Sequence, residues 1–238
     1  MEINSFSLPN IGLIIMSALL ILFIIYIWNK AKTNSTPQQQ KQFTKPILRF
    51  VGIYSVYFII ICFLANAGFF LIITSPPRLL LGFVPVFITV IILIRASTFQ
   101  SLSILKFISP WLLIAIQSFR ILVEFILVAF YKDHLVPVEL TFNGRNFDLL
   151  IGLLAIPVSF MMYKQYAFAK KAAYIFHFMG LLSLINILSI AIPSVPSTFR
   201  IYEMNYLPTY FPGILILFLA PMAIYFHLLS IKQLRILK

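Results

Sequence analysis

Apolar residues form seven long stretches along the chain, separated by short polar or charged segments. The stretches cover about residues 9–28, 48–74, 79–95, 107–131, 149–166, 172–195 and 210–231. Each has roughly 17–27 residues, which as a helix rising about 1.5 Å per residue covers a hydrocarbon core of about 30 Å. A β-barrel would instead show alternating segments of roughly ten residues. The pattern predicts an all-α, polytopic integral membrane protein, with residues 1–238 forming a single seven-transmembrane-helix bundle.

Composition leads to the same class. The chain is 61% hydrophobic and only 10% charged, whereas soluble domains are about half apolar and about a quarter charged. A soluble fold of this length could not cover so much apolar surface, so the lipid bilayer is the expected partner. Cys62 is the only cysteine, which excludes a disulfide within the chain and a cysteine metal cluster.

The charged residues between the stretches fall into two sets. One set of connections, together with the C-terminal tail, carries thirteen basic residues and no acidic one: Lys30, Lys32, Lys41, Lys45, Arg49, Arg95, Lys106, Lys164, Lys170, Lys171, Lys232, Arg235 and Lys238. The other set mixes both signs: Arg78, Lys132, Arg145 and Arg200 with Glu2, Asp133, Glu139, Asp148 and Glu203. The positive-inside rule places the basic set in the cytoplasm. We therefore expect an outside N-terminus, a cytoplasmic C-terminus and a multi-pass protein of the plasma membrane, which in a bacterium is the inner membrane.

The same distribution interprets the net charge of +12. It is a topology signal and a contact with anionic headgroups, and it does not indicate nucleic-acid binding, because no soluble basic domain carries it. The first ten residues, "MEINSFSLPN", contain no Lys or Arg. The first stretch is therefore expected to be a retained anchor and not a signal peptide. Residues 29–46 are expected to form a flexible polar connection.

The fourth stretch contains two full charges, Arg120 and Glu124, where a charge costs a few kcal/mol. Gln117, Arg120, Glu124 and Tyr131 follow i, i+3, i+7 and i+14 spacing, so they share one face of a helix. That face is expected to point into the bundle, and the i, i+4 spacing predicts that Arg120 and Glu124 pair with each other. Such a pair is either a structural ion pair or part of a ligand or proton site.

Polar residues of neighbouring stretches fall at a similar depth. Helix rise places Glu124 about 10 Å and Arg120 about 16 Å below the outer surface. Asn66 and Asn186 fall about 12 and 13 Å below it on the second and sixth stretches. We therefore predict a polar pocket in the outer half of the bundle, with Asn66 and Asn186 as further ligand-binding or proton-coupling candidates.

The predicted outer connection over residues 132–148, "KDHLVPVELTFNGRNFD", is amphipathic. Apolar residues interleave with charges, so we expect this connection to fold back over the bundle as a lid. The lid candidates are Glu139, Asn143, Arg145, Asn146 and Asp148. A structural alternative is that Asn143–Gly144 forms a turn and Asp148 caps the following helix.

The histidines carry less information. His177 and His227 lie near the inner ends of their stretches and are expected to make local hydrogen bonds at the interface. No carboxylate or cysteine accompanies them at that depth, so neither a metal site nor a cofactor is predicted. No catalytic residue is assigned either, and the weaker enzyme hypothesis is lipid modification at the outer surface through His134, Glu139 and Asp148.

The functional hypothesis is a membrane protein that binds or transports a small molecule or ion. Glu124 would be the titratable group and Arg120 the counter-charge that binds an anionic substrate. One alternative is a seven-helix receptor or sensor without retinal, since the last stretch holds no deep lysine. Another is an accessory subunit of a membrane complex, and both a homo-oligomer and a membrane-protein partner stay open. The sequence does not indicate an enzyme.

Overall fold

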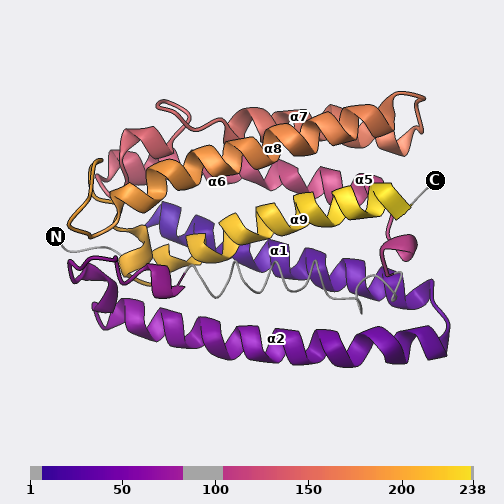
Figure 1. Ribbon diagram of the computed structural model, residues 1–238, viewed down its shortest axis with the longest axis horizontal. Coiled ribbons are helices and arrows are strands. Elements are labelled where there is room, and N and C mark those ends of the chain that lie inside the picture. The colour runs from indigo at the N-terminus through magenta and orange to yellow at the C-terminus, as the bar shows by residue number, and fades with distance from the viewer. Residues whose placement is uncertain (1–6, 83–103, 237–238) are drawn as a thin grey trace.

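The computed structural model describes residues 7–82 and 104–236, and its regular structure is helical (Figure 1). The α-helices are α1 (Leu8–Thr33), α2 (Pro37–Asn66), α5 (Pro110–Ala115), α6 (Phe119–Lys132), α7 (Asp148–Tyr163), α8 (Ala169–Ala191) and α9 (Ile216–Ile236). The 3₁₀ turns are η1 (Phe69–Leu71), η2 (Ile104–Phe107), η3 (Ile116–Ser118), η4 (Val138–Leu140), η5 (Ile192–Ser194), η6 (Leu207–Thr209) and η7 (Gly213–Leu215). The all-α prediction is confirmed for these residues.

The helices lie along one common axis and give the bundle two distinct ends (Figure 1). At one end α1, α7 and α9 finish and α2, α5 and α8 begin. This basic end carries lysines and arginines of the set that the sequence assigns to the cytoplasm, among them Lys32, Lys164, Lys170 and Arg235. We call the opposite end, where α1 begins, the distal end.

Four helical segments are long and apolar enough to cross a membrane by length and composition. They are Leu8–Thr33, Pro110–Lys132, Ala169–Ser194 and Gly213–Ile236. Val51–Asn66 and Asp148–Tyr163 are apolar but shorter. Most of the third predicted stretch, residues 79–95, lies outside the described residues. The chain therefore has the helices of a multi-pass membrane protein, and the number seven stays a prediction.

The connection after α1 is shorter and more ordered than the sequence analysis expects. α2 begins at Pro37, within the segment predicted to be a flexible connection over residues 29–46. Thr36 caps the helix: its hydroxyl accepts from the backbone of Gln39, and the Gln39 side chain accepts from the backbone of Thr36 at 2.9 Å. The flexible-connection prediction is wrong here, because a capping box and a proline in the first turn favour a helix start.

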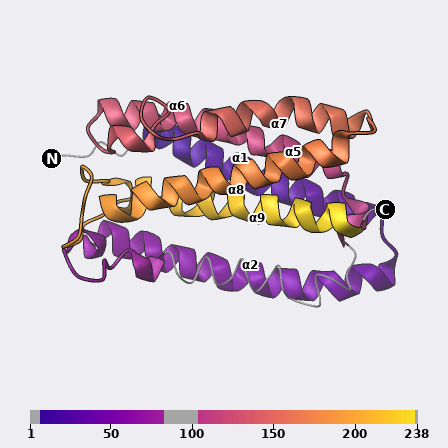
Figure 2. The ribbon, with the colours of Figure 1, turned by 45° about the horizontal axis from the view of Figure 1, so that its top comes forward.

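Two views place α2 at one edge of the helix array, with α1, α5, α6, α7, α8 and α9 gathered beside it (Figures 1 and 2). The main hydrophobic cluster joins α1, α6, α8 and α9 around residues such as Leu20, Phe130 and Phe226. Many large apolar side chains outside this cluster are exposed, including Ile53, Phe63 and Ile185. An exposed apolar surface of this extent suits a helix bundle in lipid.

The connection between α6 and α7 folds back into the bundle. Leu135, Val136 and Leu140 are buried, and the backbone carbonyl of Leu135 accepts from Tyr206 N at 2.9 Å. α7 then begins at Asp148, which pairs with Arg120 near the start of α6, so α7 starts well inside the level at which α6 ends. The fold-back expected from the amphipathic pattern is thus observed, and it brings residues 146–148 down beside α6.

Candidate functional site

A close crossing of α6 and α7 is the framework of the site. A Cβ placed on Gly152 would lie 2.7 Å from Ile121 Cγ1 and 2.9 Å from the Ile121 backbone nitrogen. Only glycine allows the two helices to approach this closely, because a larger residue would have to push α6 away. Asp148 lies one turn before Gly152, so the crossing brings its carboxylate to the level of Arg120.

Arg120 and Asp148 form a buried ion pair. The side chains are 2% and 10% exposed, and Arg120 Nη2 donates to Asp148 Oδ1. The Ser183 hydroxyl of α8 donates to the same oxygen at 2.6 Å. The predicted direct pairing of Arg120 with Glu124 is therefore wrong: Glu124 acts on Arg120 at longer range. The fold-back of residues 133–147 brings the Asp148 carboxylate closer to Arg120 than the Glu124 carboxylate is. A buried guanidinium is stabilised by such a direct hydrogen-bonded pair.

Glu124 is held by the folded-back connection. Its Oε1 accepts from Asn146 Nδ2, and its Oε2 is buried without a hydrogen-bond partner. Asn146 Oδ1 in turn accepts from the backbone nitrogen of Asp148 at 3.0 Å. The side chain that hydrogen-bonds to the backbone at the start of α7 is therefore that of Asn146 and not that of Asp148. The predicted capping role of Asp148 is wrong. The carboxylate of Asp148 is occupied by Arg120.

Two buried histidines extend the network through α8 and α9. Arg120 Nη1 lies 3.1 Å from His227 Nε2, and His227 Nδ1 lies 2.9 Å from His177 Nδ1. Both rings are fully buried and meet partners on other helices, so the prediction of local hydrogen bonds is wrong. The cause is helix length: α8 begins at Ala169 and α9 reaches Ile236, which places both residues farther from the basic end than the predicted boundaries do.

Gln117 lies one turn before Arg120 and is also fully buried. Its Nε2 donates to the backbone carbonyl of Ala223 in α9 at 3.0 Å, while its Oε1 has no partner. Gln117 belongs to η3, a 3₁₀ turn that interrupts the α-helical geometry between α5 and α6. Such a turn within a long helix often marks a hinge or a functional position.

The other helix candidates lie away from this network. Asn66 is exposed at the end of α2 and accepts from the backbone of Phe211 at 3.0 Å. Asn186 donates to the backbone carbonyl of Arg145 at 2.6 Å. Tyr131 packs against the main hydrophobic cluster. The similar depth of Asn66 and Asn186 along separate helices does not bring them to Arg120, because depth does not determine which face a residue occupies.

The lid candidates divide into two groups. Asn146 and Asp148 are buried in the network, whereas Asn143 and Arg145 are exposed and Glu139 is partly exposed. The guanidinium of Arg145 donates to the Tyr202 hydroxyl at 3.3 Å. His134 is exposed as well, so the surface group of His134, Glu139 and Asp148 is not gathered in one place.

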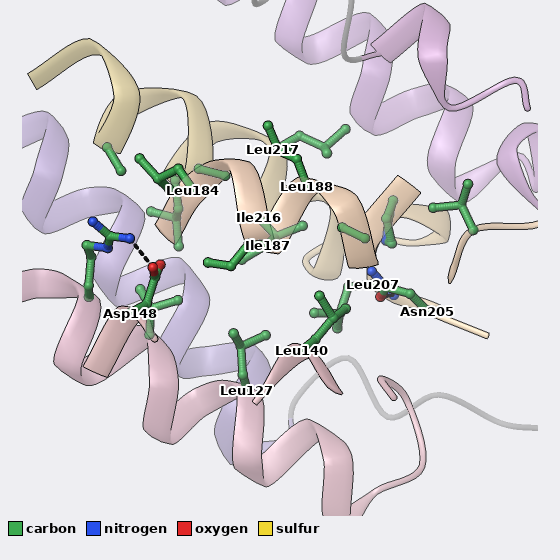
Figure 3. A pocket seen from close by; sticks show the side chains of 18 of the residues that line it. Leu127, Leu140, Asp148, Leu184, Ile187, Leu188, Asn205, Leu207, Ile216 and Leu217 are labelled. Atoms are coloured by element: carbon green, nitrogen blue, oxygen red, sulfur yellow. Dashed lines mark hydrogen bonds and ion pairs between the residues drawn. The ribbon is translucent and has the colours of Figure 1, made fainter. Parts of the chain in front are cut away.

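A pocket of about 80 Å³ opens beside the ion pair. Its walls are mostly aliphatic and come from α6, α8, α9 and the connection before α9, with Leu127, Leu184, Leu188 and Ile216 among them. Figure 3 shows Asp148 and its ion pair on one side of the pocket and Asn205 on the other. Arg120 also lines the pocket, and its Nε is buried without a hydrogen-bond partner.

The buried network therefore comprises Arg120, Glu124, Asn146, Asp148, His177, Ser183 and His227. Within residues 7–82 and 104–236, no group of three or more His, Cys, Asp or Glu side chains is arranged to hold a metal ion. Sequence reasoning missed Ser183 and the joining of the histidines to Arg120. The available signal was burial: a histidine on an otherwise apolar helix face needs a polar partner within the bundle.

Comparison of the chain with models of known protein families, with curated proteins and with solved structures found no significant match.

Proposed function

We propose that the protein is a seven-span plasma-membrane transporter for a small organic acid that has an aliphatic body. The observation that carries this proposal is the aliphatic pocket that ends at Arg120. Pockets that bind small molecules combine mostly apolar walls with a few polar groups that fix orientation. Arg120 lines the pocket and its buried Nε has no partner, so the guanidinium has a donor left for a carboxylate once the side chain turns toward the pocket.

The seven-span part of the proposal is supported by connectivity. After α2 the described chain turns at the distal end, where Thr74 forms a β-bridge with Ser197, and by Gly82 it lies beside Tyr57 of α2, whose hydroxyl donates to the Gly82 carbonyl at 2.7 Å. It continues at the basic end, where Phe107 O accepts from Asn34 Nδ2 at 3.4 Å. The sequence predicts a span over residues 79–95 between these two points, and this predicted span brings the proposed number of passes to seven. The positive-inside rule then places the basic end in the cytoplasm and the pocket in the outer half.

Charge balance supports a coupled ion. Asp148 and Glu124 place two carboxyl groups beside the single guanidinium of Arg120. An unbalanced charge in the bundle interior is costly, so the empty site is neutral when one carboxyl holds a proton. We assign that proton to Glu124, because Asp148 is paired directly with Arg120. An anion that enters this neutral site needs one further proton, which makes proton-coupled uptake the natural mechanism.

Hexanoate binding to the protein in lipid nanodiscs tests the proposal, with hexanol and hexylammonium as probes of equal chain length. We expect hexanoate to bind and the other two to bind at least tenfold more weakly, since one lost charged hydrogen bond costs about 1.5–3 kcal/mol. Leu188→Trp fills the pocket and should abolish binding. The matched control Leu182→Trp, at an exposed position of the same helix, should retain it.

Equal binding of hexanoate and hexanol would contradict a carboxylate site. If none of the three probes binds, the network is structural and the receptor or accessory-subunit alternatives take precedence. Uptake of labelled hexanoate into proteoliposomes, driven by an imposed pH gradient, then separates a transporter from a protein that only binds.

A further inference from the structure

We propose that the His177–His227 pair is the protonation site that couples the pocket to the basic end of the bundle. When the organic anion binds at Arg120, the pair takes up one proton. When the anion leaves, the pair releases it. This inference rests on the proposed function and names the residues that would carry the coupled proton.

Hydrogen-bond geometry fixes the protons of the empty site. Arg120 is always charged and can only donate, so His227 Nε2 has to accept from it. The proton of His227 is then on Nδ1, and it is donated to His177 Nδ1 at 2.9 Å. His177 consequently carries its own proton on Nε2. Both histidines are neutral in this arrangement.

The two ends of this chain of hydrogen bonds differ. One end is anchored on Arg120, while His177 Nε2 at the other end is buried with no partner. A buried polar atom without a partner is uncommon and requires an explanation. It is the place where a further group, such as a water molecule that exchanges protons, can reach the pair.

A polar face of α9 leads from the pair to the basic end. His227, Ser230 and Gln233 follow one another at three-residue spacing, and all three are fully buried. Ser230 Oγ and Gln233 Oε1 have no partner, while Gln233 Nε2 donates to the backbone carbonyls of Leu105 and Ile108. Buried polar side chains within a membrane bundle usually mark an ion or proton pathway.

The surroundings of the pair explain why its protonation depends on the anion. Arg120 of α6 faces the pair directly, and the carboxyl groups around Arg120 are Asp148 of α7 and Glu124 of α6. α5 has no titratable side chain. The contact that α1 makes beside the pair is apolar, with the ring of Phe23 against that of Phe226. Without ligand, an imidazolium would lie beside the guanidinium with no added negative charge, which is unfavourable.

A bound carboxylate changes this balance. Its negative charge compensates one new positive charge, so the site stays neutral when the pair binds a proton from water. In this step an N–H bond forms on the pair. Once protonated, His227 Nε2 can no longer accept a hydrogen bond from Arg120, and it donates to a carboxylate oxygen of the ligand. Arg120 then turns its freed donor to the ligand. Loading thus consumes one proton for one anion.

Isothermal titration of hexanoate into nanodiscs, in two buffers with different ionisation enthalpies, measures the protons taken up. The wild type should take up about one proton per anion, and its affinity should fall about tenfold per pH unit in the alkaline range. His227→Gln retains an acceptor for Arg120, and His177→Asn retains an acceptor for His227. In both variants proton uptake should disappear while weaker, pH-independent hexanoate binding persists.

His134→Gln, which changes an exposed histidine at the distal end, is the matched control and should keep the uptake. If His227→Gln does not fold, His177→Asn decides the question. Continued uptake of one proton by a folded histidine variant would overturn this inference and leave the proposed function intact, with a carboxyl group as the acceptor. Failure of the wild type to bind hexanoate would overturn both.

Discussion

The ring of His227 lies against the backbone of α8 at Gly180. A Cβ on Gly180 would lie 2.2 Å from His227 Cε1 and 2.3 Å from Nε2. The absence of a side chain at this position therefore sets where the imidazole lies, and with it the contact to Arg120. A residue without chemistry of its own thus determines the geometry of the network.

Gly180→Ala should destabilise the protein by about 1–3 kcal/mol, because the added methyl group overpacks the histidine site. Gly52→Ala is the control: nothing lies within 4 Å of that position in α2, and alanine should stabilise the helix by about 0.5–1 kcal/mol. Unfolding in mixed detergent and SDS measures both. The double variant Gly180→Ala with His227→Ala should recover part of the loss, and no recovery would show that the clash lies elsewhere.

The ion pair allows a second test at the residue scale. Arg120→Gln and Asp148→Asn should each cost about 3–5 kcal/mol, because each leaves an unpaired charge in the bundle. The double variant should cost less than the sum, since neither charge is left. The control Arg145→Gln, at an exposed position, should change stability by less than about 0.5 kcal/mol. Additive losses in the double-mutant cycle would mean that the two side chains are not coupled.

At the scale of elements, the sequence predicts the helices better than their ends and contacts. Long apolar runs locate α1, α8 and α9, because lipid selects for such runs. The stripe of Gln117, Arg120 and Glu124 correctly indicates a buried polar face. The partner of Arg120 was not predictable, since Asp148 reaches it only through a folded-back connection and a glycine crossing. Helix periodicity identifies faces but gives no contacts between helices.

The folded-back connection can be tested at Asn146. Its side chain bonds to Glu124, to the carbonyl of Leu140 at 2.9 Å and to the backbone of Asp148. Asn146→Ala should cost about 1–3 kcal/mol, because buried partners lose their hydrogen bonds. Hydrogen exchange over residues 133–147 should accelerate as the segment loosens. Asn143→Ala, exposed in the same segment, is the control, and equal exchange in both variants would refute the anchoring role.

At the scale of the whole molecule, the two ends of the bundle differ in charge, and this difference determines how the pocket faces the membrane. If the basic end is cytoplasmic, the pocket and the folded-back connection face outward and the histidine pair lies between the pocket and the cytoplasm. If the orientation were reversed, the same network would release protons outward. Orientation therefore determines the direction of any coupling.

Cysteine labelling decides the orientation, and Cys62 can be replaced by alanine to give a background without thiols. Gln38→Cys lies in the first turn of α2 at the basic end, and Asn143→Cys lies in the exposed part of the distal connection. A membrane-impermeant maleimide added to intact cells should label residue 143 at once and residue 38 only after the membrane is opened, because basic segments stay in the cytoplasm. Labelling of residue 38 in intact cells would reverse the orientation and place the pocket on the cytoplasmic side. Labelling of both would mean that the two ends do not lie on opposite sides, which would contradict a bundle that crosses the bilayer along its long axis.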